Sequence, residues 1–266
     1  VIGMSLYDTT GSKDAPVRFK LYHPDSTIPL SDALPMFEHM GFRVIEEAPH
    51  RVEPTTDSGR VVMIHDFGLV TQDGMPVNVA DIRENFHDAF QQVWYGAVES
   101  DGFNALVCRG GLTWRQVAII RAYCKYLRQA GIPFSQIYME QTLSRNPKLA
   151  RMIVDLFQAM FNPDEQKTAA RNIARIQKSF EAGLENVTSA DEDRILRRFL
   201  NVVDCTLRTN YYQPDDNGAD KPYISFKLNS RNVEELPLPR PLREIFVYSP
   251  RVEGIHLRFG MVARGG

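Results

Sequence analysis

The stretch LSDALPMFEHMG, residues 30 to 41, decides how the first third of this chain folds. Its apolar side chains recur at intervals of three and four, which places them on one face of a helix. They are Leu30, Ala33, Leu34, Phe37 and Met40. Gly41 follows the last of them, and glycine commonly ends helices in the left-handed conformation. The stretch therefore predicts an amphipathic helix.

This helix and its neighbouring segments together form a recognisable order of strands and helices. Residues 17–24 and 60–70 have the composition of strands, and 42–54 is a further strand candidate. Residues 79–98 carry apolar side chains at helical spacing, and the apolar run 104–108 can supply a last strand. The order β-α-β-β-α-β is that of a ferredoxin-like fold, with two helices on one face of a sheet. The other face is then free to pair or bind.

The second region is predicted to be helical throughout. It holds four or five amphipathic segments, each preceded by residues that favour a helix start. These start signals are Thr113 with Gln116, Asn146-Pro147, Asn162-Pro163, and Ser189 with Glu192. We therefore expect a helical bundle with a continuous core, in which Cys124 is buried.

A turn-rich segment, residues 211–222, separates these helices from three short strand candidates. The candidates are YISFKL, EIFVYSP and VEGIHLRFG, which together are too few residues for a domain. The chain begins at Val1 rather than at a methionine and ends on Arg264, Gly265 and Gly266. We therefore expect a segment of a longer protein, with an incomplete sheet at its end.

Composition limits the classes of function. The 266 residues include 43% hydrophobic and 24% charged residues, with a net charge of -2, which argues against a general polyanion binder. The three cysteines match no zinc spacing and favour a reducing compartment. No apolar run approaches the roughly 20 residues that span a bilayer, and no signal-peptide pattern is present. We expect a cytoplasmic protein that binds no membrane.

The short motifs of the chain favour structural interpretations. The HDFG run at residues 65–68 lacks the other kinase signatures and is interpreted as a strand entering a turn. No glycine-rich dinucleotide loop, P-loop or zinc-protease motif occurs, and the six histidines lack metal-ligand spacing. The basic stretch between residues 112 and 152 favours a contact between domains over nucleic-acid binding.

Several longer phrases, taken in order, resemble the large bacterial NAD-specific glutamate dehydrogenases. They are PLSDALPMFEHMGFRVIEEAPHRV, MIHDFGL, DGFNALVCRGGLTWRQVAIIRAYCKYLRQAG, LRTNYY, ISFKLNS and EIFVYSPRVEGIHLRFGMVARGG. The resemblance covers nearly all of the chain from about residue 16. It implies an α+β segment with an ACT-like regulatory domain, a helical domain and the start of a catalytic domain. The expected ranges are an N-terminal flank (1–15), the ACT-like domain (16–110), the helical domain (111–212), a linker (213–222) and truncated catalytic strands (223–266).

The resemblance also gives the terminal residues a role. Glutamate dehydrogenases carry a Lys-Gly-Gly whose lysine meets the side-chain carboxylate of the substrate. Arg264, Gly265 and Gly266 lie at the place of that motif, with arginine where the family pattern has lysine. The resemblance thus implies that these residues form one edge of a glutamate pocket. The catalytic residues and the NAD site are expected elsewhere in the parent enzyme, so this segment alone is expected to be inactive.

A regulatory role is the second implication. ACT domains commonly receive amino-acid effectors at the loop after the first strand, here residues 23–32. Candidate ligand residues are Asp25, Ser26, Thr27 and Ser31, although the glycine frequent in such loops is missing. A purely structural, pairing role for this loop stays open. The alternative function is a non-enzymatic amino-acid-sensing or oligomerising module. In either case we expect a homo-oligomer, and in the enzyme the remaining domains of the polypeptide are its further partners.

Overall fold

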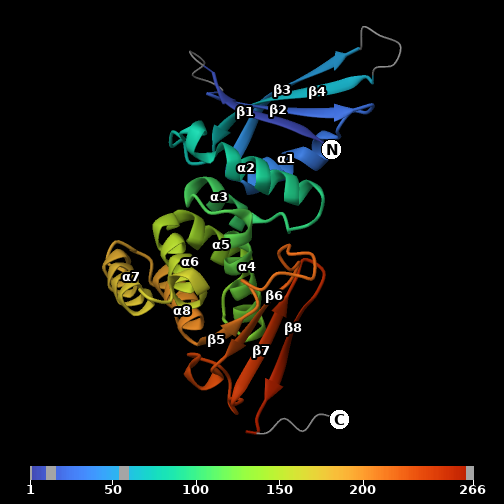
Figure 1. Cartoon of the computed structure of the whole chain (residues 1–266). Coiled ribbons are helices and arrows are strands. Elements are labelled where there is room, and N and C mark those ends of the chain that lie inside the picture. The colour runs from blue at the N-terminus through green and yellow to red at the C-terminus, as the bar shows by residue number, and fades with distance from the viewer. Residues whose placement is uncertain (1, 10–15, 54–59, 262–266) are drawn as a thin grey trace. The chain divides into compact units, whose positions relative to one another are not determined.

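The structure, a computed structural model, describes residues 2–9, 16–53 and 60–261 of the chain. The chain forms two compact units, Val1–Trp114 and Arg115–Gly266. Each unit contains a four-stranded antiparallel sheet together with helices (Figure 1).

The first unit is a sheet with two helices on one face (Figure 1). Its strands are β1 (Gly3–Asp8), β2 (Val17–Pro24), β3 (Phe42–Val52) and β4 (Val62–Thr71), in the order β1-β2-β4-β3. The helices are α1 (Leu30–His39) and α2 (Val79–Trp94). Phe19 of β2 lies at their meeting point, with ring centroids 5.4 Å from Phe37 of α1 and 5.0 Å from Phe90 of α2. The predicted ferredoxin-like layering of sheet and helices is confirmed.

The end of α1 and the start of α2 follow the usual capping chemistry. Gly41 adopts a φ of +88° directly after α1, a conformation that costs little without a Cβ atom. Its N–H donates to the carbonyl of Glu38, which ends the helix. At the start of α2 the side chain of Asn78 accepts a hydrogen bond from the N–H of Ala80.

Two assignments in the first unit need correction. The run 104–108, predicted as the last strand, is helical: a 3-10 turn, η1 (Gly102–Asn104), continues into α3 (Ala105–Arg109). The Asp101 side chain accepts from the N–H of Phe103, and this cap favours the helical turn. The fourth strand is instead β1, which lies in the segment predicted to be a flank and pairs antiparallel with β2. The edge place in the sheet is therefore filled from the opposite end of the sequence.

The second unit begins with the predicted helices. They are α4 (Trp114–Gln129), α5 (Gln136–Arg145), α6 (Pro147–Phe161), α7 (Ala169–Leu184) and α8 (Ala190–Asp204), with the 3-10 turn η2 (Pro163–Glu165) before α7. Ser189 caps α8 as expected, because its hydroxyl accepts from the N–H of Glu192. Asn146 was expected to cap α6 and does not: its amide instead donates to the carbonyl of Thr142 and to Glu192.

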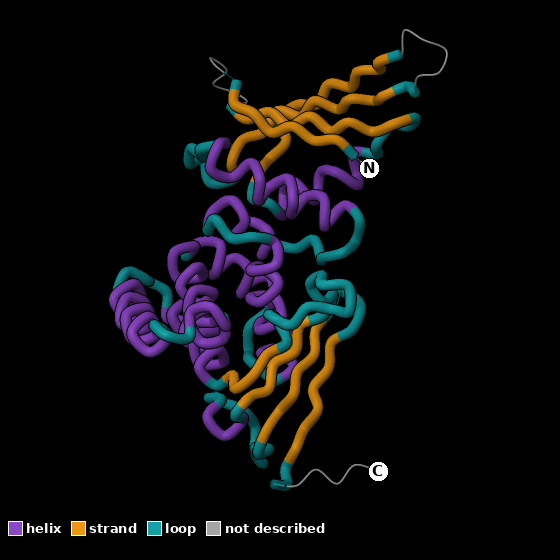
Figure 2. Tube along the Cα trace, viewed as in Figure 1, coloured by secondary structure: helices purple, strands orange, loops and turns teal. Residues whose placement is uncertain are grey.

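The second sheet packs against α4 rather than standing apart from the helices (Figure 2). Its strands are β5 (Thr206–Thr209), β6 (Ile224–Leu228), β7 (Arg243–Tyr248) and β8 (Glu253–Arg258), in sequence order, with the 3-10 turn η3 (Ser230–Asn232) after β6. The ring of Tyr123 stacks on Phe226 with centroids 4.1 Å apart, and Tyr126 meets Phe246 edge-on. Cys124, predicted to be buried, is fully buried.

Helices and strands of the second unit thus share one core. The strand β5 lies inside the range predicted to be helical and pairs with β6 across the turn-rich segment. The α+β fold class is confirmed. The assignment of functional domains to the five predicted ranges stays a prediction, because packing alone gives no function to a range.

Candidate functional site

The predicted substrate loop lies outside the described residues. Arg264, Gly265 and Gly266 fall in the undescribed range 262–266, which follows β8 in the sequence. The last described turn is held by Arg258, whose Nε donates to the carbonyl of Gly260 at 3.1 Å. The role of the three terminal residues therefore stays a prediction.

The predicted effector residues lie on an exposed loop between β2 and α1. Asp25, Ser26, Thr27 and Ser31 are all exposed. Asp25 has a φ of +66°, a conformation that aspartate tolerates better than most residues. The hydroxyl of Ser26 lies 3.1 Å from Nδ1 of His23, and that of Ser31 donates to Asp32. The two hydroxyls are thus engaged with neighbours within the loop and the first turn of α1, and no hydrogen bond among the described residues joins any two of the four candidate side chains.

A buried histidine fixes this loop to the sheet. Nε2 of His65 accepts a hydrogen bond from the backbone N–H of Ile28 at 3.1 Å. Because a backbone N–H only donates, the proton of a neutral His65 sits on Nδ1, which lies 2.8 Å from Oε1 of Glu47. The HDFG run was predicted to be a strand entering a turn, but residues 65–68 lie wholly inside β4, so the predicted turn is wrong. Its histidine has a structural role, because it holds the loop that carries the candidate effector residues.

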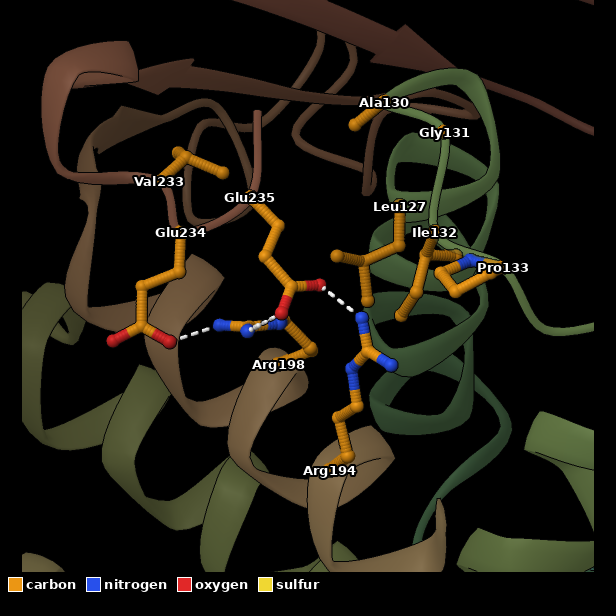
Figure 3. Close-up of a pocket in the computed structure, with 10 residues that line it drawn as sticks. All are labelled: Leu127, Ala130, Gly131, Ile132, Pro133, Arg194, Arg198, Val233, Glu234 and Glu235. Carbon is orange, nitrogen blue, oxygen red and sulfur yellow. Dashed lines mark hydrogen bonds and ion pairs between the residues drawn. The ribbon is translucent and has the colours of Figure 1, made fainter. Parts of the chain in front are cut away.

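A charged pocket in the second unit was not predicted from the sequence. It lies between α8, the turn after α4 and the segment that follows η3, and has a volume of about 350 Å³. The carboxylate of Glu235 lies between the guanidinium groups of Arg194 and Arg198 (Figure 3). Arg194 Nη2 donates to Glu235 Oε2 at 2.7 Å, and Arg198 pairs with both Glu234 and Glu235.

The electrostatics of this pocket follow from these pairs. The hydrogen bond from Arg194, with a further contribution from Arg198, lowers the pKa of the Glu235 carboxyl below its ordinary value. The Glu235 side chain is nevertheless 45% exposed, whereas that of Arg198 is only 11% exposed. Arg194 also lies 5.6 Å from the ring centroid of Phe134, which supports its guanidinium from a second side. Arg198 is thus the buried partner of the group, whereas Glu235 and Arg194 are both partly exposed.

One signal for this pocket was present in the sequence. Arg194 and Arg198 are four residues apart, so they share a face of the predicted helix, and Glu234 and Glu235 are adjacent. Nothing local connects the two pairs, which lie about 40 residues apart and meet only when α8 packs beside η3.

Comparisons with known proteins place the chain in a family. Three family models match: "Glutamate dehydrogenase, ACT3 domain" over residues 1–82, "Glutamate dehydrogenase, helical motif 3" over 98–163, and "Bacterial NAD-glutamate dehydrogenase, catalytic domain" over 179–266. The NAD-specific glutamate dehydrogenase of Pseudomonas aeruginosa is 44% identical over 99% of this chain. Those of Halomonas elongata and Mycobacterium tuberculosis are 42% and 46% identical over 100% and 90% of it.

The chain belongs to the bacterial NAD-specific glutamate dehydrogenase family. It spans 15% to 16% of the length of these three relatives. The catalytic-domain match begins within α7, so α8 and its two pocket arginines fall in the same matched range as the second sheet.

The described residues of this glutamate dehydrogenase segment do not fit a dinucleotide. Both sheets are antiparallel throughout, whereas the pyrophosphate of NAD is typically held at a helix that follows a strand of a parallel sheet. Within the described ranges, no three or more acidic, histidine or cysteine side chains gather as metal ligands would. No helix in those ranges is both long and apolar enough to cross a bilayer.

Proposed function

We propose that this chain is part of an enzyme that converts L-glutamate, NAD and water into 2-oxoglutarate, ammonia and NADH. The supporting observation is the identity of 42% to 46% over at least 90% of the chain with three NAD-specific glutamate dehydrogenases. Three separate glutamate dehydrogenase family models match successive stretches of the chain, which together cover most of its length.

Within that enzyme, this segment supplies regulation, scaffolding and one edge of the glutamate pocket. Arg264 would hold the side-chain carboxylate of glutamate, since a guanidinium offers two parallel N–H donors to a carboxylate. Gly265 and Gly266 would let the backbone approach the substrate, because they lack a Cβ atom. NAD would be bound by other domains of the same polypeptide. The proposed enzyme is a homo-oligomer in the cytoplasm.

The test of the proposal is Arg264→Ala in the full-length enzyme. Removal of the guanidinium leaves the substrate carboxylate without its partner, a loss of about 2–5 kcal/mol for a buried charge pair. We expect kcat/KM for glutamate to fall accordingly, while the affinity for NAD stays nearly constant. Arg264→Lys should restore part of the activity, because the charge returns without the fork of donors.

The matched control is Arg251→Ala, which removes an exposed arginine from the turn between β7 and β8. Steady-state kinetics should show wild-type values for this control. Norvaline lacks the side-chain carboxylate, so kcat/KM for norvaline should fall little when Arg264 is replaced. Equal losses for glutamate and norvaline would contradict a role of Arg264 in carboxylate recognition. Absence of glutamate-dependent NADH formation by the wild-type enzyme would contradict the proposed reaction itself.

The loop of residues 23–32 is proposed as the regulatory part of the segment. Its support is the ACT-domain match over residues 1–82 and the exposure of Asp25, Ser26, Thr27 and Ser31. An amino-acid effector presents an ammonium and a carboxylate, which carboxylate and hydroxyl side chains can bind. Titration calorimetry with a panel of amino acids should detect a ligand whose heat of binding is lost in the Asp25→Ala variant. A panel that gives no heat with the wild-type protein would leave the loop with its structural role only.

A further inference from the structure

The pocket between Arg194, Arg198 and Glu235 has the features of a ligand site that is closed by its own chain. Its two cations come from one helix face, because Arg194 and Arg198 are separated by one turn of α8. Its anions come from the segment after η3. The acid that bridges both arginines, Glu235, is far more exposed than Arg198 and about as exposed as Arg194.

The backbone of Glu235 adopts a conformation that is unfavourable for a glutamate residue. Its φ is +60°, in the left-handed region, where a side chain with a Cβ atom crowds the backbone. The ion pairs to the arginines therefore hold a strained residue in place. Departure of the Glu235 side chain would lose these pairs but would let the strained segment relax, so another anion can compete for the arginines.

One hydrogen-bond donor of Arg198 also stays unused while Glu235 occupies the pocket. The Nε of Arg198 is buried and has no hydrogen-bond partner among the described residues. Nε and Nη2 lie on the same edge of a guanidinium and form the fork that a carboxylate fills with two oxygens. Glu235 takes Nη2 alone, so a carboxylate placed differently can make one hydrogen bond more than the resident one.

The remaining wall and the charge balance define the class of ligand. Leu127, Ile132 and Pro133 line the pocket beside Arg194, which favours an aliphatic body (Figure 3). When Glu235 leaves, Glu234 stays paired with Arg198, and the two arginines keep one positive charge in excess. One carboxylate balances this charge, whereas a phosphate dianion would exceed it next to Glu234.

We propose that this pocket binds a small aliphatic carboxylate, whose charged end replaces Glu235 on Arg194 and Arg198 and whose body lies against Leu127 and Ile132. Glu235 then acts as an internal competitor that keeps the site closed when the ligand is scarce. The proposal concerns binding by this segment and stands apart from the proposed dehydrogenase reaction.

The test measures binding of pentanoate, a five-carbon monocarboxylate, to the 266-residue chain by titration calorimetry. Glu235→Gln removes the competing charge, so we expect the pentanoate dissociation constant to fall by about tenfold or more. Glu235→Gly removes the carboxylate and also suits the left-handed backbone, so it keeps the fold and should give the same gain. Arg194→Gln should raise the dissociation constant by a similar factor.

The matched control is Arg197→Gln on the same helix. Arg197 pairs with Glu181 and Asp193 and does not line the pocket, so this variant should bind pentanoate as the wild type does. Inorganic phosphate, added in place of pentanoate, should bind more weakly. The proposal is overturned if both Glu235 variants bind pentanoate no more tightly than the wild type, if Arg197→Gln weakens binding as much as Arg194→Gln, or if phosphate binds as tightly as pentanoate.

Discussion

Leu127 shows how one residue serves both the core and a pocket. Its side chain belongs to the buried stripe of α4, is 3% exposed and also lines the pocket beside Arg194. Leu127→Ala should cost about 2–5 kcal/mol of unfolding free energy, as cavity-forming changes do. We expect the lower end of that range, because the new space would join an existing pocket instead of forming a closed void.

Urea denaturation of the wild type and the variant measures this loss. Ile137→Ala on α5 is the matched control, since the Ile137 side chain is 65% exposed and its removal should change stability little. A near-zero loss for Leu127→Ala would mean that the α4 stripe contributes little to the core of the second unit.

Glu244 illustrates what the sequence could and could not predict at this scale. It alternates with the buried residues Phe246 and Tyr248 along β7, so the period of two already places it on the inner face. Its partner could not be found this way: the phenol of Tyr126, 118 residues earlier, donates to its carboxylate. Burial raises the pKa of the Glu244 carboxyl and of the Tyr126 phenol. The charged pocket was missed for the same reason, because its partners meet only through the fold.

At the scale of elements, the edge strand β1 is held by side chains of α2 and by Tyr95, the residue that follows α2. The backbone N–H of Leu6 donates to Nε2 of His87 at 3.1 Å, and Arg83 Nε donates to the carbonyl of Leu6 at 2.9 Å. The N–H of Ile2 donates to the hydroxyl of Tyr95. These contacts occupy backbone groups on the outer side of an edge strand, where an unprotected strand tends to pair with other chains.

The contact between His87 and Leu6 should make the first unit sensitive to acid. Burial, assisted by the nearby Arg83, lowers the pKa of His87 below its ordinary 6.5. The unfolded chain therefore binds a proton to this histidine more readily than the folded chain does. The contribution of His87 to the unfolding free energy is fully present above pH 6.5. It is lost as pH falls from 6.5 through the lower pKa of the folded state. Below that range Nε2 carries a proton and cannot accept from Leu6.

The measurement is the unfolding free energy as a function of pH for the wild type and for His87→Gln. The glutamine carbonyl can accept the Leu6 N–H but does not titrate, so the variant should lose less stability between neutral and mildly acidic pH. Substitution of the exposed His50 by glutamine should leave the pH profile of the wild type nearly unchanged. Identical profiles for the wild type and His87→Gln would show that this contact does not control the response to acid.

The elements differ in how well the sequence predicted them. The helices α1, α4 and α8 have long apolar stripes bounded by start or stop residues in the sequence, so their existence followed from the pattern alone. The run 104–108 was misassigned because four apolar residues in a row fit a strand or a helix equally well, and the cap at Asp101 decides for the helix. Strand β1 has only six residues, and its place at the sheet edge depends on pairing with β2.

At the scale of the whole molecule, each unit has its own closed core. In the first unit the ring of Phe19 is fully buried against Phe37, Phe86 and Phe90. In the second unit Tyr123, Phe157 and Phe226 form a comparable aromatic cluster between helices and sheet. Units of 114 and 152 residues are of ordinary domain size, large enough to fold by themselves.

We therefore expect the units to unfold as separate cooperative blocks. Phe19→Ala should lower the stability of the first unit by about 3–5 kcal/mol, because it leaves a cavity among three other phenylalanines. The stability of the second unit should stay at its wild-type value, since that unit contributes none of these rings. Hydrogen exchange followed by mass spectrometry reports the two units separately in one sample. Faster exchange confined to the strands and helices of the first unit is the expected result. Equally accelerated exchange in α4, α6 and β6 would contradict independent cores, and would mean that the two units form one cooperative block.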